Sequence, residues 1–178
     1  SGEGVEFDSP LCGQDVDLCA RQLFGCTTMP NLVIGVEICE DLWGTQPPSG
    51  LLAAAGATVM LNLSASDEVV GKAEYRRALV TGQSARLVCG YVYADAGEGE
   101  STTDMVFSGH NLIAENGALL AERRFACGLT ISEIDVDRLV YERRRMNTYS
   151  ASKEAMEIGR VNFDLEREET RLTPRLSP

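Results

Sequence analysis

Three continuous apolar runs constrain the fold of this 178-residue chain more than any other feature of its sequence. They read NLVIGVEI at residues 31–38, ATVMLNL at 57–63 and LVCGYVYA at 87–94. Apolar runs of this length without polar alternation are typical of strands that are buried on both faces. Because the intervening residues favour helices, the strand–helix–strand order predicts an α/β fold with parallel neighbouring strands.

Helices are expected at residues 51–56, which are rich in alanine, and at residues 71–87, the longest helical pattern in the chain. Apolar and small residues recur near helical spacing in the second helix and predict its inner face: Tyr75, Leu79, Val80, Ser84 and Leu87. Its arginines are left for the other faces: Arg76, Arg77 and Arg86.

The second half of the chain carries a hairpin signal, because two short apolar runs within residues 110–124 flank the dipeptide Asn116-Gly117. A further strand is expected at 129–134. A helix is expected at 135–146, with Asp135 at its start and three arginines, Arg143, Arg144 and Arg145, at its end as the helix dipole favours.

Both ends of the chain lack such strong patterns. Residues 1–30 are predicted to be irregular, with a short helix near 16–23, whereas residues 161–165 alternate apolar and polar side chains and predict an edge or exchanged strand. The predicted organisation is therefore an irregular segment at 1–30, a domain at 31–146 and an extended tail at 147–178.

The charge balance excludes some partners. With 27 acidic and 16 basic residues the formal net charge is -11, which disfavours binding to nucleic acid or to an anionic membrane. The sequence also lacks an apolar run of about 18 residues and a basic, then apolar N-terminal segment. The expected location is therefore the cytoplasm.

The six cysteines are predicted to be free thiols, because the chain does not have the cysteine density of a small disulfide scaffold. Regular spacing of Cys12, Cys19 and Cys26 raises the alternative of a zinc site. Zinc sites usually contain a close cysteine pair and a fourth ligand, and the one histidine, His110, lies far away in the sequence. No metal site is therefore expected.

Cys39 is the candidate nucleophile, because it follows the first apolar run, and the ends of parallel strands are where α/β proteins place their ligand sites. The alternative is an inert core cysteine. Three acids nearby, Glu37, Glu40 and Asp41, favour the interpretation of Cys39 as a nucleophile, since buried acids are costly unless they line a polar pocket.

Candidate partners for Cys39 are few. His110 lies in a turn-like segment and is not expected to pair with it, so a carboxylate would serve as base and a lysine would stabilise an oxyanion. Of the two lysines, Lys153 lies in the polar tail, whereas Lys72 begins the helix on the Cys39 side of the sheet.

The glycine-rich residues 97–102 lack the frame of a phosphate loop, and their glutamates would repel phosphate.

Four segments in order resemble one family: GVEICEDLW, then GATVMLNLSAS with Gly71-Lys72, then YVYADAGEGESTTD, and HNLIAENG. Together they resemble the nitrilase superfamily of carbon-nitrogen hydrolases, and specifically the glutaminase domain of glutamine-dependent NAD synthetases, over residues 30–146. The resemblance implies an α-β-β-α sandwich that self-associates. It also implies a Glu-Lys-Cys triad that hydrolyses glutamine through a thioester and passes ammonia to a separate ATP-using domain.

Residue by residue, the resemblance makes Cys39 the nucleophile and Glu40 the acid that follows it. Trp43 matches a position that walls the glutamine pocket, and Ser66 and Lys72 match substrate contacts, with Lys72 placed to meet the α-carboxylate. Glutamine and the synthetase domain are thus the implied partners, and homo-oligomers are expected.

The sequence departs from the family at its beginning. In the family the base Glu and the oxyanion Lys precede the nucleophile strand, but residues 1–30 contain no lysine, and no SGGxDS-type loop for ATP occurs. We therefore expect about the second half of the glutaminase domain, little activity on its own, and ATP and magnesium only in a synthetase domain. A non-catalytic oligomerising half-domain and another nitrilase-type amidase are the alternatives.

Overall fold

The computed structural model describes residues 5–9, 14–19, 21–149 and 158–166. Its strands are β1 (Val5–Ser9), β2 (Gln14–Leu18), β3 (Gln22–Cys26), β4 (Val33–Ile38), β5 (Val59–Ser64), β6 (Gly90–Asp95), β7 (Asn111–Glu115), β8 (Ala118–Arg123) and β9 (Gly159–Phe163). Its helices are α1 (Pro48–Ala54), α2 (Lys72–Leu87) and α3 (Val136–Arg145), with short 3-10 helices η1 (Cys39–Trp43) and η2 (Glu98–Glu100).

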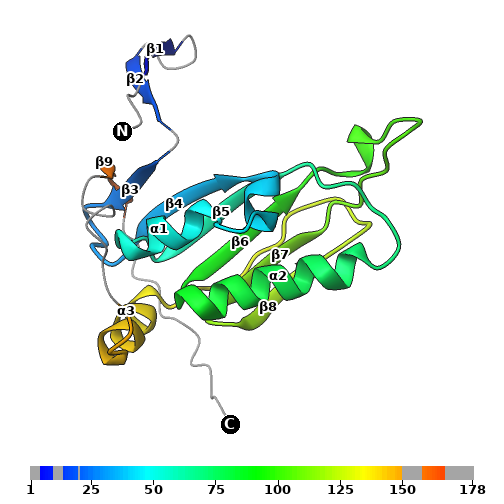
Figure 1. Cartoon of the computed structure of the whole chain (residues 1–178). Coiled ribbons are helices and arrows are strands. Elements are labelled where there is room, and N and C mark those ends of the chain that lie inside the picture. The colour runs from blue at the N-terminus through cyan, green and yellow to red at the C-terminus, as the bar shows by residue number, and fades with distance from the viewer. Residues whose placement is uncertain (1–4, 10–13, 20, 150–157, 167–178) are drawn as a thin grey trace.

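A seven-stranded sheet with the order β8-β7-β6-β5-β4-β3-β9 forms the centre of the molecule (Figure 1). The three apolar runs form β4, β5 and β6, which are adjacent and parallel, as the sequence predicted. β7 and β8 continue the sheet antiparallel on one side, and β3 pairs antiparallel with β4 on the other. The expected mixed α/β class is confirmed.

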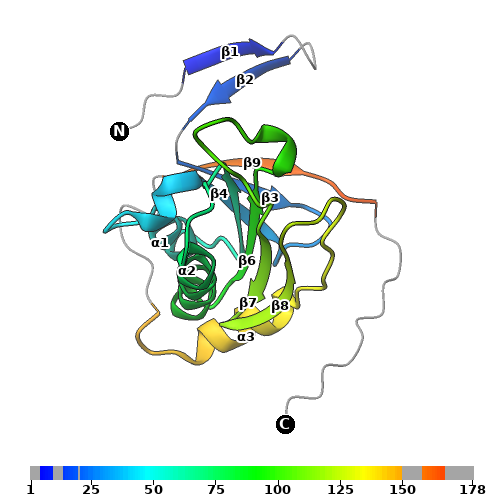
Figure 2. The same cartoon turned by 90° about the vertical axis from the view of Figure 1, so that its right-hand side faces the viewer.

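Helices α1 and α2 lie on one side of this sheet (Figure 2). The side chains that face them form the core, because alternate strand residues point to the same face. In register across the sheet, one row holds Gly35, Met60 and Tyr91, and the next holds Glu37, Asn62 and Tyr93. All six residues are buried.

The opposite face of the sheet is apolar but less covered. Val36, Leu61 and Val92 align in register and are partly exposed. The next row brings Ile38 beside Leu63, and these side chains are 63% and 56% exposed. The described residues therefore contain one helical layer and one large sheet, which matches the expectation of a partial sandwich.

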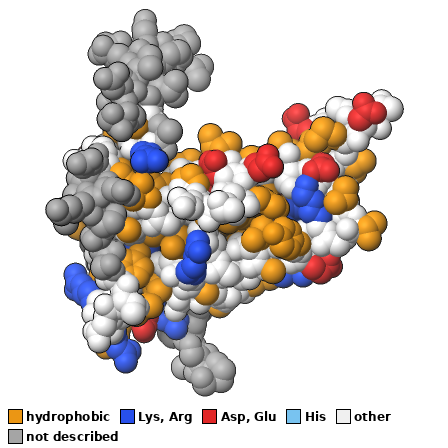
Figure 3. All heavy atoms as spheres, in the orientation of Figure 1, with side chains coloured by type: hydrophobic (Ala, Val, Ile, Leu, Met, Phe, Trp, Pro, Cys, Tyr) orange, Lys and Arg blue, Asp and Glu red, His pale blue; other side chains and the backbone are white. Residues whose placement is uncertain are grey.

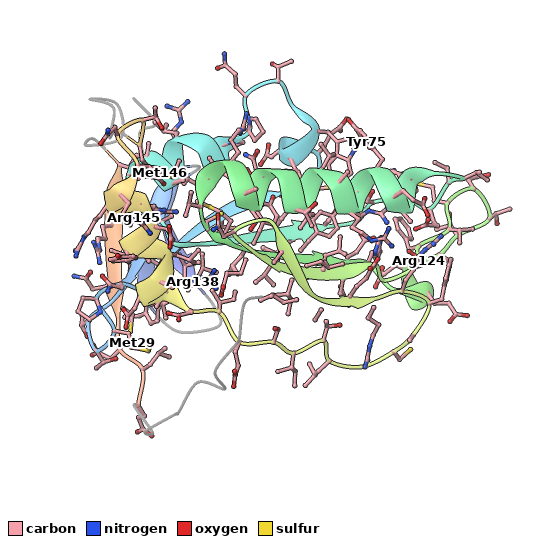
Figure 4. All side chains as sticks on the ribbon, turned by 90° about the horizontal axis from the view of Figure 1, so that it is seen from below. Met29, Tyr75, Arg124, Arg138, Arg145 and Met146 are labelled. Carbon is pink, nitrogen blue, oxygen red and sulfur yellow. The ribbon has the colours of Figure 1, made fainter. Side chains whose placement is uncertain are left out.

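The inner face of α2 differs from the prediction at two positions. Tyr75 is 55% exposed and projects from the side of α2 that is turned away from the sheet (Figure 4). Arg76, which was assigned to an outer face, is fully buried. The prediction was wrong because it sorted side chains by hydrophobicity, whereas charged and polar partners beneath the helix, described below, surround Arg76 and compensate its charge.

Two predicted elements, a helix at 16–23 and a strand at 129–134, were also wrong. The proposed helix at 16–23 is replaced by β2 and β3, because β3 pairs with strands on both of its sides and tertiary pairing overrides a weak local preference. The proposed strand at 129–134 has no regular structure. Leu129 and Ile131 are 80% and 77% exposed, so these apolar side chains are not buried against the sheet as the prediction required.

Residues 1–30, which were predicted to be irregular, contain β1, β2 and β3. Other predicted elements agree with the structure. Asn116-Gly117 forms the turn between β7 and β8, and Asp135 caps α3 by accepting a hydrogen bond from Arg138 N at 2.9 Å. The alternating tail segment forms β9 at the edge of the sheet, parallel to β3. The sheet thus takes strands from residues 22–26 and 159–163, on both sides of the segment 31–146.

The arginines at the end of α3 do not form one exposed charge cluster. Arg144 and Arg145 are exposed, but Arg143 is buried and donates to the carbonyls of Ala57 at 2.7 Å and Val88 at 2.9 Å. Arg143 therefore ties α3 to the segments that precede β5 and β6.

Charged and apolar side chains share the surface. Figure 3 shows acidic side chains at the tip of the loop that carries η2. Apolar side chains are scattered over the rest of the visible face. Among the helices of the described residues, none combines the length and apolar character that crossing a membrane requires.

Candidate active site

One cavity brings together all five residues proposed from the sequence as site residues. Cys39, Glu40, Trp43, Ser66 and Lys72 line a space of about 380 Å³, together with Ala65, Asp67 and Met105. The cavity lies where β4 and β5 end and α2 begins. It follows from the parallel arrangement of these strands, whose carboxyl ends meet at one edge of the sheet. Its volume lies within the usual range for small-molecule sites.

Cys39 occupies a sharp turn between β4 and η1. Its φ of 50° lies in the left-handed region, which is uncommon for a residue with a side chain. Asn62, on the neighbouring strand β5, holds this turn: its Oδ1 accepts a hydrogen bond from Cys39 N at 3.0 Å, and its Nδ2 donates to Cys39 O at 3.4 Å. The turn leaves the thiol half-buried at the wall of the cavity.

The Cys39 thiol contacts a small hydroxyl network. Ser64 Oγ donates to Cys39 Sγ at 3.5 Å and lies 2.6 Å from the hydroxyl of Tyr93. Burial raises the pKa of Tyr93 to about 12, so its phenol is neutral at neutral pH. Within the described part of the chain, no carboxylate or lysine lies within hydrogen-bond distance of Cys39 Sγ.

The three acids near Cys39 have different roles, and the expectation that they line one polar pocket together was wrong. Only Glu40 lines the cavity. The carboxylate of Glu37 is buried beneath α1, where it accepts from Ser49 N at 2.8 Å and from the hydroxyl of Tyr91. Asp41 accepts from Ile38 N at 2.8 Å and so stabilises the start of η1. Glu37 lies in β4 and Glu40 in η1, and the left-handed turn at Cys39 between them changes the direction of the chain.

Charges of both signs line the far side of the cavity. Lys72 Nζ donates to the carboxylate of Asp67, and both side chains are partly exposed. Asp67 was not among the residues selected from the sequence, although the acidic pair Asp67-Glu68 shortly after β5 was a signal for it. Trp43 forms another wall, with its ring 6.1 Å from that of Tyr93 and tilted by 55°.

Ser66 is held from behind by buried charged groups. Arg76 Nη2 donates to Ser66 Oγ at 3.1 Å, and Asp95 Oδ1 accepts from Ser66 N at 2.8 Å. Burial raises the pKa of Asp95, although three backbone N–H groups and Arg76 oppose that shift. Arg76 and Asp95 were not selected from the sequence, because only the folded chain shows that their charges meet behind Ser66.

His110 belongs to the same buried network and does not contact Cys39, as expected. Its Nδ1 lies 2.8 Å from Arg76 Nη1, and its Nε2 lies 2.7 Å from Glu122 Oε1. Since an arginine only donates, the ring is neutral, with Nδ1 as the acceptor and its proton on Nε2. Burial and the neighbouring Arg76 cation lower the pKa of His110, against the effect of Glu122.

The described residues contain no group of three or more metal-ligating side chains placed to hold an ion. The five cysteines that the structure describes are free thiols, as predicted, and Cys12 lies outside the described residues. The described groups in and beside the cavity thus include a thiol, hydroxyls and charged side chains.

Curated proteins with similar sequences include glutamine-dependent NAD(+) synthetases from several organisms. The glutamine-dependent NAD(+) synthetase of Mycobacterium tuberculosis (strain H37Rv) is 45% identical over 155 residues, which cover 85% of this chain and 23% of that protein. The chain thus spans less than a quarter of the length of this curated relative. No protein-family model matches the chain.

Solved structures agree with the sequence comparison. A glutamine-dependent NAD(+) synthetase from Cytophaga hutchinsonii aligns with a TM-score of 0.55 and 27% identity over 79% of this chain and 22% of that one. A carbon-nitrogen hydrolase from Helicobacter pylori G27 aligns with a TM-score of 0.54 over 62% of this chain and 43% of that one. At 17% identity, this match shows a similar fold only.

Proposed function

The chain is related in sequence and fold to glutamine-dependent NAD(+) synthetases, and we propose that it is a nitrilase-type domain that forms the glutamine-binding and nucleophile-bearing part of their glutaminase domain. In this role Cys39 attacks the side-chain amide of glutamine. The ammonia that is released serves the amidation of deamido-NAD in a synthetase domain, and ATP and magnesium act there.

The observation that carries the proposal is the composition of the cavity wall. A half-buried thiol in a left-handed turn lies beside Glu40, Asp67 and Lys72, so the cavity offers charges of both signs to one ligand. Glutamine is a zwitterion with an uncharged amide at its other end. Lys72 suits its α-carboxylate, an acid of the cavity suits its α-ammonium group, and Trp43 covers its apolar carbons.

The proposed reaction has two steps. In the first, Cys39 Sγ forms a bond to the amide carbon, the carbon–nitrogen bond breaks, and the nitrogen leaves as ammonia with the proton that the thiol gives up. In the second, water attacks the thioester carbon, the carbon–sulfur bond breaks, the hydroxyl of the water stays on the acyl carbon, and its other proton returns to sulfur. Glutamate is then released. Ser64 and Tyr93 keep the sulfur in place through their hydroxyl groups.

We expect the chain alone to release little or no ammonia. A general base and a group that stabilises the oxyanion together contribute several orders of magnitude to the rate of such reactions. The described contacts of Cys39 Sγ provide a serine hydroxyl, which is a poor base. In the proposal the remaining part of the domain supplies a glutamate and a lysine.

A labelling experiment tests the proposal on the chain as it is. L-6-diazo-5-oxonorleucine, a glutamine analogue with an electrophilic carbon at the amide position, is incubated with the chain and with Cys39→Ala, and adducts are located by peptide mass spectrometry. We expect saturable labelling at Cys39 that L-glutamine protects against. A Lys72→Met variant should raise the half-saturating analogue concentration, and exposed Cys127 serves as an internal control for nonspecific reaction.

Ammonia release from glutamine is measured in parallel. Labelling that is absent at Cys39, or that glutamine leaves unchanged, contradicts the proposal and favours a non-catalytic half-domain. Labelling that hexanamide blocks as well as glutamine does would instead favour a general nitrilase-type amidase. We also propose a cytoplasmic location and self-association, and the second of these is tested below.

A further inference from the structure

The guanidinium of Arg76 holds the loop that forms the polar wall of the cavity, and we propose that Arg76 is a positioning residue for substrate binding. This inference rests on the proposed function. Arg76 lies outside the cavity wall, fully buried beneath α2. It acts on a ligand through Ser66 and Asp67, which do line the cavity.

Three of the acceptors of Arg76 belong to these two residues. Its Nη2 donates to Ser66 Oγ at 3.1 Å, to Ser66 O at 3.4 Å and to Asp67 O at 3.2 Å. Its Nη1 donates to Glu68 Oε2 at 3.2 Å and to His110 Nδ1 at 2.8 Å. The planar guanidinium thus joins the loop at residues 66–68 to His110, which precedes β7.

Asp95 completes the hold on Ser66. Its Oδ1 accepts from Ser66 N at 2.8 Å, and its Oδ2 lies 3.9 Å from Arg76 Nη2. The N–H, carbonyl and hydroxyl groups of Ser66 are therefore all bound by charged side chains from β6 and α2. Bonds to charged groups are shorter and stronger than neutral ones, so they define a single position for this residue.

Arg76 also influences the position of Lys72, because both residues bind Asp67. Arg76 fixes the backbone of Asp67, and the Asp67 carboxylate accepts from Lys72 Nζ. Lys72 and Arg76 are four residues apart in α2 and so lie on one side of the helix. One buried arginine therefore sets the separation between a hydroxyl, an acid and an amine that face the same ligand.

A second buried arginine provides a matched control. Arg143 also donates to backbone carbonyls, those of Ala57, Leu87 and Val88, but it lies at the end of α3 and contacts no residue of the cavity wall. Loss of either arginine leaves buried carbonyl groups without donors. Only loss of Arg76 should release the loop at 66–68.

The test compares Arg76→Lys, Arg76→Met and Arg143→Met with the natural chain. Amide hydrogen exchange at residues 66–68 is measured by NMR, and labelling of Cys39 is measured against the concentration of L-6-diazo-5-oxonorleucine and with iodoacetamide. We expect both Arg76 variants to exchange these amides about tenfold faster or more and to raise the half-saturating concentration of the analogue about tenfold. The maximal labelling rate and the iodoacetamide rate should change less than about twofold.

In Arg143→Met we expect a lower thermal midpoint with unchanged exchange at 66–68 and unchanged half-saturation. If Arg76→Met does not fold, Arg76→Lys decides, because it keeps the charge and most of the volume. Unchanged exchange at 66–68 in the Arg76 variants, or an equal effect in Arg143→Met, would overturn the proposal. Absence of saturable labelling in the natural chain would instead reject the proposed function, while the exchange comparison would still decide the role of Arg76.

Discussion

At the scale of single residues, the candidate nucleophile depends on the neighbouring strand for its backbone conformation. A left-handed φ costs a residue with a side chain about 1–2 kcal/mol, so the turn at Cys39 persists only if other interactions hold it. Asn62 provides two of them through one buried amide group, which also donates to the Tyr91 hydroxyl at 3.2 Å.

Asn62→Ala should therefore destabilise the chain by about 1–3 kcal/mol, because it leaves the Cys39 N–H group without an acceptor. Urea unfolding measures the loss, and amide exchange at Cys39 should become faster. Asn31→Ala is the matched control, since Asn31 donates to Asp137 in an exposed contact away from the cavity. A loss in Asn62→Ala no larger than that in Asn31→Ala would argue against this role.

His110 gives a pH dependence with a defined sign. Burial, with a contribution from Arg76, lowers its pKa in the folded chain below the reference value of 6.5. Glu122 and Glu68 act in the opposite direction. The neutral ring therefore stabilises the fold fully above pH 6.5, and this contribution is lost as the pH falls from 6.5 toward the lower folded pKa.

We expect the stability difference between the natural chain and His110→Gln to shrink on acidification from pH 8 to pH 5. Glutamine keeps one donor and one acceptor but does not titrate, so the comparison at each pH removes the effect of the carboxylates. Urea midpoints at each pH measure the difference. A difference that stays constant over this range would contradict the lowered pKa of His110.

At the scale of elements, the β7–β8 hairpin shows how local sequence fixes a turn. Asn116 and Gly117 have φ values of 46° and 86°, as a two-residue turn between antiparallel strands with right-handed twist requires. Gly117 also packs closely on α2, where a Cβ atom would lie 2.9 Å from that of Ala85. Both the backbone and the helix thus exclude a side chain at residue 117.

Gly117→Ala should destabilise the chain by about 1–2 kcal/mol or more, from the positive φ and the contact with α2. Asn116→Gly is the control in the same turn, and it should be neutral or slightly stabilising because glycine adopts positive φ freely. Urea unfolding at neutral pH measures both. Equal stability of Gly117→Ala and the natural chain would mean that the turn rearranges.

At the scale of the whole molecule, the two faces of the sheet differ. One face is covered by α1 and α2, and the other leaves a row of apolar side chains partly open, with Ile38 and Leu63 more than half exposed. Apolar surface of this kind favours association, since its burial contributes about 25 cal/mol per Å². The strand β9 pairs with β3 within the same chain and so covers that edge of β3.

We predict that the chain self-associates through this open face. Size-exclusion chromatography with light scattering should give a dimer or larger species for the natural chain, and a shift toward monomer for Leu63→Asp. Tyr75→Asp, at an exposed site on the outer side of α2, should leave the mass unchanged. A compact monomer for the natural chain at high micromolar concentration would contradict self-association.

Elements whose residues act locally or in long uniform patterns could be predicted from the sequence. The apolar runs predicted β4, β5 and β6, the Asn-Gly dipeptide predicted the hairpin, and Asp135 predicted the start of α3. The parallel order of the strands placed Cys39 at the sheet edge, and the motif resemblance selected Glu40, Trp43, Ser66 and Lys72. These five side chains line one cavity in the folded chain.

Tertiary structure alone decided the features that depend on distant partners. The first 30 residues contribute β3 because β4 and β9 lie on either side of it, whereas residues 129–134 pair with no strand of the described residues and are irregular. Arg76 is buried because Glu68, Asp95 and His110 surround it from three other segments. The sequence alone predicts that a charged side chain is exposed to water, and only the fold supplies the opposite charges that compensate its burial.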